Sequence, residues 1–104
     1  MRWQSKAWLA RLHLNNGNYR AAIEAARESM QIVPNLGAAL ILVVAQVQVG
    51  QIADARKVMA DQMSYWKGFS FDHNNSVVLP RLCKSSSILD RMQRIHREAA
   101  AAIR

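Results

Sequence analysis

The stretch Asn16-Gly17-Asn18-Tyr19-Arg20-Ala21-Ala22 contains the spacing Gly-x-Tyr-x-x-Ala, and Gly50-Gln51-Ile52-Ala53-Asp54-Ala55 repeats it as Gly-x-Ile-x-x-Ala thirty-three residues later. An apolar helical pattern precedes each Gly, and another follows each Ala. A fixed period in this range is typical of helix-turn-helix solenoids, in which neighbouring hairpins bury each other's faces. The sequence therefore predicts an all-α scaffold that binds other chains, and not a catalytic centre.

Turn residues and apolar spacing predict four helices in the repeated region, over about 2–15, 19–32, 36–49 and 52–65. Gly17 ends the first helix, where we expect a positive φ, and Gly50 ends the third. Pro34 ends the second, because proline lacks an amide hydrogen and disfavours helix at Val33. The third helix is apolar on nearly every side, so it must lie between two layers or face a partner.

The other helices each carry an apolar stripe that we expect to be buried. The expected stripes are Trp8, Leu9, Ala10 and Leu12 in the first helix, Ala22, Ile23, Ala26 and Met30 in the second, and Ile52, Ala55, Val58, Met59 and Met63 in the fourth. After a turn-rich loop we expect a short helix over about 75–83, and then a last helix that opens at the capping box Ser87-x-x-Asp90. The stripe of this last helix is Ile88, Met92, Ile95, Ala99 and Ala102.

The repeated unit resembles the tetratricopeptide repeat family. The matching residues are Leu9-Ala10, Gly17-Asn18-Tyr19, Ala22 and Pro34 in the first copy, and Leu42-Val43, Gly50-Gln51-Ile52 and Ala55 in the second. The departures are Lys6 in place of a bulky residue, His13 in place of an aromatic, and Lys67-Gly68 in place of the closing proline. The resemblance covers about residues 3–68 and implies a right-handed superhelix of antiparallel helix hairpins.

The chain is short enough to form one domain over 1–104, with repeat 1 at about 3–35, repeat 2 at about 36–68 and a helical cap at about 75–103. Two repeats rarely bury a continuous core on their own, so we expect the cap to cover the second hairpin. The layout also resembles the repeat region at the end of some bacterial adenylate cyclases and transcriptional regulators. That resemblance implies an accessory or assembly domain of a larger bacterial regulatory protein.

The tetratricopeptide resemblance implies a peptide-binding surface on the first helix of each hairpin, which we call the helix A face. Its expected lining is Gln4, Ala7, Arg11, Leu14, Asn15, Leu40, Val44, Val47 and Gln48. Cationic and polar groups in the first repeat and apolar ones in the second suit an acidic peptide with an apolar anchor. Two alternatives stay open: the last helix of the same chain covers the apolar part, or a second copy does so in a homodimer.

A net charge of +7, from 14 Lys and Arg against 7 Asp and Glu, favours acidic partners. The densest basic region contains Arg81, Lys84, Arg91, Arg94, Arg97 and Arg104. Such a helix face can follow a phosphate backbone, but no aromatic residue is interleaved for base stacking. A solvated surface is therefore the simpler interpretation, and nucleic-acid binding is the lesser alternative.

The aromatic residues offer another set of contacts. Trp3, Trp8 and Trp66 could serve as binding platforms, since Trp is enriched at interface hot spots. Helical spacing favours core or hairpin-capping positions for them instead. Of the three, we expect Trp3 to be the best candidate for an exposed contact, because it lies closest to the start of the chain.

Catalytic and metal-binding patterns are weak. The spacing brings neither His73 nor His96 to Cys83, as a Cys–His nucleophile requires, and Asp72-His73 alone offers too few ligands for zinc. We therefore expect no enzymatic activity, no metal and no cofactor. The apolar stretch 36–49 is shorter than the ~20 residues that span a bilayer. With a single cysteine and no signal-peptide pattern, the sequence predicts a cytoplasmic protein without a membrane partner.

Overall fold

The computed structural model describes residues 2–63, 79–82 and 85–103. Among these residues the regular secondary structure is entirely helical: α1 (Trp3–Asn15), α2 (Tyr19–Ile32), α3 (Leu36–Gln48), α4 (Ile52–Met63), α6 (Leu79–Leu82) and α7 (Ser86–Ile103). The all-α class is confirmed, and the right-handed superhelix stays a prediction. The expectations for Met63 as an inward side chain and for Trp66, Asp72, His73, Cys83, Lys84 and Arg104 lie outside the described side chains.

The two glycine turns have the same geometry. Gly17 has a φ of 77° and Gly50 a φ of 85°, which confirms the expected left-handed conformation at Gly17. In the first turn Asn18 donates its backbone N–H to the His13 carbonyl at 2.8 Å, and in the second Gln51 donates to the Gln46 carbonyl at 2.8 Å. These bonds satisfy carbonyls that a helix end leaves without an intrahelical partner. The turn is therefore repeated in structure as well as in sequence.

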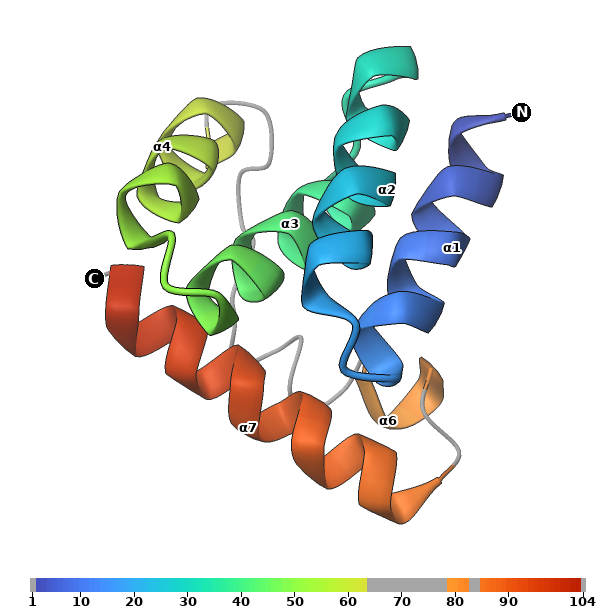
Figure 1. Ribbon diagram of the computed structural model, residues 1–104, viewed down its shortest axis with the longest axis vertical. Coiled ribbons are helices and arrows are strands. Elements are labelled where there is room, and N and C mark those ends of the chain that lie inside the picture. The colour runs from blue at the N-terminus through green and yellow to red at the C-terminus, as the bar shows by residue number, and fades with distance from the viewer. Residues whose placement is uncertain (1, 64–78, 83–84, 104) are drawn as a thin grey trace.

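Helix α3 lies at the centre of the molecule. It packs against α1 and α2 of the first hairpin, against α4, and against α7. Figure 1 shows α7 crossing past α3, from α6 at one end toward α4 at the other. Every residue from Ala38 to Gln46 is buried. The apolar third helix thus lies between layers, as its composition predicts.

The predicted stripes agree with the structure in α2, α4 and α7. The fully buried or nearly buried members are Ala22, Ile23, Ala26, Ala55, Met92, Ile95 and Ala99. The partly buried members are Met30, Ile52, Val58, Met59, Ile88 and Ala102. One start is corrected: α7 begins at Ser86, and Leu89 donates its N–H to the Ser85 carbonyl at 2.9 Å. Ser87 therefore lies inside the first turn and does not cap the helix.

The expected stripe of α1 is wrong at three of its four residues. Trp8, Leu9 and Leu12 are 58%, 37% and 43% exposed, whereas the burial of Ala10 is confirmed, and Leu14 is fully buried as well. Two stripes at helical spacing compete on this helix, and the one that contains Ala10, Arg11 and Leu14 faces the core. Small residues let α1 approach the alanines of α2, where larger ones would hold the helices apart.

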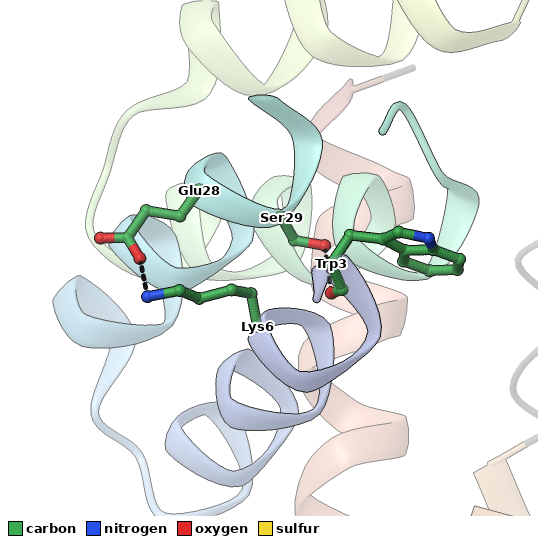
Figure 2. Close-up of polar contacts among 4 residues, drawn as sticks. All are labelled: Trp3, Lys6, Glu28 and Ser29. Atoms are coloured by element: carbon green, nitrogen blue, oxygen red, sulfur yellow. Dashed lines mark hydrogen bonds and ion pairs between the residues drawn. The ribbon is translucent and has the colours of Figure 1, made fainter. Parts of the chain in front are cut away.

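A polar network joins the start of α1, the end of α2 and the start of α3. The Ser29 hydroxyl donates to the Trp3 carbonyl at 2.8 Å, and the Asn35 amide donates to Ser29 Oγ at 3.2 Å. Asn35 Oδ1 in turn accepts the Ala38 N–H at 2.8 Å, which caps α3. Figure 2 shows Ser29 against Trp3, and beside them the Lys6–Glu28 ion pair between α1 and α2. The first hairpin is thereby fixed to the start of α3.

Replacing Asn35 tests this network. We expect Asn35→Ala to lower the free energy of unfolding by about 1–2 kcal/mol, because a buried N-cap and its amide bonds are lost. Asn18 precedes α2 but makes no side-chain cap bond, so Asn18→Ala is the matched control and should cost far less. Denaturant unfolding measures both, and equal losses would contradict the assignment.

The glycine turns allow a second comparison. Gly17→Ala and Gly50→Ala should each lower the free energy of unfolding by about 1 kcal/mol, since a Cβ is disfavoured at positive φ. Gly37 lies on the exposed side of α3, where a Cβ would meet only Asn35 Oδ1 at 3.7 Å. Gly37→Ala should therefore leave stability unchanged or raise it by up to about 1 kcal/mol. Thermal unfolding of the three variants reports the difference, and losses at all three glycines would count against the turn geometry.

Candidate interaction surfaces

The helix A face is largely closed. Leu14, Leu40 and Val44 are buried, and Arg11 is 9% exposed. The half-buried members of the expected lining are Ala7, Asn15, Val47 and Gln48, and Gln4 is exposed. The prediction that Leu40 and Val44 present an apolar patch to a partner is therefore wrong. Whether the remaining residues bind a partner stays a prediction.

Helix α7 contributes to this closure, because it packs against α3 and α4. Gln48 Nε2 on α3 donates to Glu98 Oε2 on α7 at 2.8 Å. Arg56 Nη2 on α4 donates to the Ala102 carbonyl, near the end of α7, at 3.1 Å. The apolar stripe of α7 is buried at Met92, Ile95 and Ala99. Of the two alternatives to an open groove, coverage by the last helix of the same chain agrees with the structure.

His96 is a buried polar residue in this contact, and the apolar spacing of α7 gives no signal for it. Its side chain is fully buried, and burial lowers its pKa from 6.5 to about 4. The positive charge of Arg11 on α1 also lowers this pKa, while the hydrogen bond with the Met92 carbonyl opposes the shift. That bond, 2.6 Å long, requires a hydrogen on Nδ1 because a carbonyl only accepts. Because the pKa of His96 is lowered to about 4, its ring is neutral at pH 7, and the buried Nε2 then carries no hydrogen.

Stability should depend on pH through His96. The folded-state pKa lies below the unfolded-state value, so the unfolded chain binds the proton first as pH falls. We expect the free energy of unfolding to decrease by up to about 3 kcal/mol between pH 6.5 and pH 4. His96→Gln should flatten this slope in urea titrations at several pH values, and His13→Gln on α1 should retain it. An unchanged slope in His96→Gln would contradict the assignment.

Among the described residues, the exposed large apolar side chains are Trp8, Leu9 and Leu12 on α1, and Ile32 and Val33 at the end of α2. The larger group is the one on α1. We call Ser5, Trp8, Leu9 and Leu12 the outer face of α1; all four are exposed. Of the two tryptophans that the structure describes, Trp8 is exposed, whereas Trp3 is half-buried and its carbonyl accepts the Ser29 hydroxyl. The expectation that Trp3 is the better exposed contact is thus wrong. Isolated apolar residues are common on surfaces, but adjacent ones on a single helix face indicate an interaction site.

In the second repeat, the residues equivalent to the apolar members of the outer face of α1 are buried. Thirty-three residues after Trp8, Leu9 and Leu12 stand Ile41, Leu42 and Ala45. All three are buried, with 2%, 5% and 0% exposure. Helix α3 packs against both helices of the preceding hairpin, α1 and α2. Helix α1 packs against α2 of its own hairpin and α3 of the next, and it has no preceding hairpin in this sequence. The same register is therefore buried in α3 and open in α1.

A pocket of about 320 Å³ lies at the start of α2 and is lined by Gly17, Asn18, Tyr19, Arg20, Ala21 and Val49. Two further grooves lie along α2. The larger, of about 420 Å³, is lined by Arg20, Ile23, Glu24, Arg27, Glu28, Gln31 and Gln51. The smaller, of about 190 Å³, lies between α1 and α2 and includes Lys6, Leu9 and Glu28. Both mix positive and negative side chains and neither encloses a buried titratable group. They place charged side chains of both signs beside the outer face of α1.

The remaining expected sites add little. Arg81, Arg94 and Arg97 are exposed and Arg91 is half-buried, as a solvated face of α6 and α7 requires. Within the described ranges, no three His, Cys, Asp or Glu side chains gather as a metal site would need. No described helix has the length and apolar character needed to cross a membrane. Comparisons with family models, curated proteins and solved structures give no match to this chain.

Proposed function

We propose that this chain is a non-enzymatic protein–protein interaction module of the tetratricopeptide-like type, and that its binding surface is the outer face of α1. The observation that carries the proposal is the contrast between Trp8, which is 58% exposed, and its repeat counterpart Ile41, which is 2% exposed. A tryptophan flanked by leucines on an open helix face supplies the rigid apolar area that interface hot spots use. The single cysteine fits a reducing compartment, so the proposal includes a cytoplasmic location.

The proposed binding surface, the outer face of α1, differs from the helix A face that the sequence predicts. A partner that used Leu40 or Val44 would first have to displace α7, which carries three buried apolar residues of its own. Displacement would also break the Gln48–Glu98 and Arg56–Ala102 hydrogen bonds and expose His96. Binding to α1 needs no such rearrangement. An open surface is therefore the simpler site for a partner.

Photocrosslinking in the source cell tests the proposal. A benzoylphenylalanine in place of Ser5, at the edge of the outer face, should give a discrete crosslinked protein. The same crosslinker in place of Lys57, on the exposed side of α4, is the matched control and should give none. Adding Trp8→Asp to the Ser5 probe should remove the crosslink, because a charge in the apolar contact is costly to desolvate. Crosslinks that survive Trp8→Asp, or that appear equally from position 57, would reject the surface.

A further inference from the structure

A titratable ring lies within the surface that attaches α7 to the rest of the molecule. The buried residues of α7 are Met92, Ile95, His96 and Ala99, so the His96 ring shares this surface with three apolar side chains. Helix α7 packs against α3, α4 and α6. Because His96 is fully buried, its ring can meet water only if α7 separates from its neighbours.

The surroundings of the His96 ring suit its neutral form. Nδ1 donates to the Met92 carbonyl at 2.6 Å, and this bond uses the one hydrogen of the neutral ring. Protonation would add a hydrogen to Nε2, which is buried and has no hydrogen-bond partner among the described residues. Burying a charged N–H group without an acceptor is costly. The closed position of α7 therefore disfavours a protonated His96.

The charges around the ring add to this cost. The positive charge of Arg11 on α1 opposes a second positive charge on His96. Helix α3 contains no ionisable residue, and no described Asp or Glu is buried. The charged residues described on α4, α6 and α7 are Asp54, Arg56, Lys57, Asp61, Arg81, Asp90, Arg91, Arg94, Arg97 and Glu98. All of these are exposed except Arg91, which is half-buried.

We propose that α7 is a pH-sensitive cover of α3: in acid, protonation of His96 detaches α7 from α3 and α4, while α1, α2 and α3 stay packed together. The contacts that hold the first hairpin do not involve α7, because α1 packs against α2 and both pack against α3. The hydrogen bonds of Ser29 and Asn35 join the same three helices. Proteins open locally in such units, at a lower free energy than global unfolding.

The two pKa values of His96 set the size of the effect. Burial lowers the pKa from 6.5 to about 4, so a ring released into water binds its proton more tightly than the buried ring. As pH falls below 6.5, proton uptake therefore favours the open form. Between pH 7 and pH 4 the equilibrium constant for opening should rise about a hundredfold.

Hydrogen exchange of backbone amides in the full chain measures this opening. After correction for intrinsic exchange, the protection of amides in the second half of α7 should fall about a hundredfold between pH 7 and pH 4. Amides in the middle of α2 should stay at least about tenfold more protected than those of α7 at both pH values, because α2 keeps its neighbours. Equal protection of α2 and α7 at pH 4 would show that the helices open together, and would overturn the inference.

Variants of the full chain assign the effect to the ring. His96→Gln keeps a polar side chain that does not titrate in this range, so the protection of α7 should no longer depend on pH. His13→Gln on α1 is the matched control and should retain the hundredfold fall. A fall that survives His96→Gln would overturn the inference. NMR titration of the His96 ring in the parent chain needs no substitution: proton uptake near pH 4 is expected, and uptake near pH 6.5 would contradict the proposal.

Discussion

The burial of α3 is the constraint on which the rest of the structure depends. Every side chain from Ala38 to Gln46 is removed from water, which needs a neighbour on each side of the helix. The first hairpin, α4 and α7 supply those neighbours. Because burial of apolar surface is the dominant favourable term in folding, α7 is bound to the helix A face as part of the core. A free peptide would have to compete with a segment of the same chain that pays no entropy of association.

Local signals determined the elements that sequence reasoning predicted well. Gly17, Gly50 and Pro34 act through backbone geometry, so they place the ends of α1, α2 and α3 within a residue. Which stripe of α1 is buried depends instead on whether another hairpin lies against it, and residue spacing carries no such information. The burial of Arg11 and His96 was missed for the same reason, because polar residues that interrupt an apolar pattern give no sign of burial.

Comparison of the two repeats shows that equivalent positions in α1 and α3 differ in burial. The turn is the same in both repeats, and so is the position of the helix that precedes it, yet Trp8 lies in solvent where Ile41 lies in the core. Exposed leucines and a tryptophan lose the hydrophobic stabilisation that their counterparts in α3 gain. A partner helix that covers them would recover it.

The reactivity of thiols introduced at the two equivalent positions tests this asymmetry most directly. Trp8→Cys and Ile41→Cys would each be made with Cys83→Ser, so that each protein carries one thiol, and treated with a thiol reagent under native conditions. We expect the thiol at position 8 to react as fast as it does in urea, and the thiol at position 41 to react at least about a hundredfold more slowly, since it must wait for opening of the core. Equal rates at the two positions, or protection at position 8, would contradict an open α1 beside a closed α3.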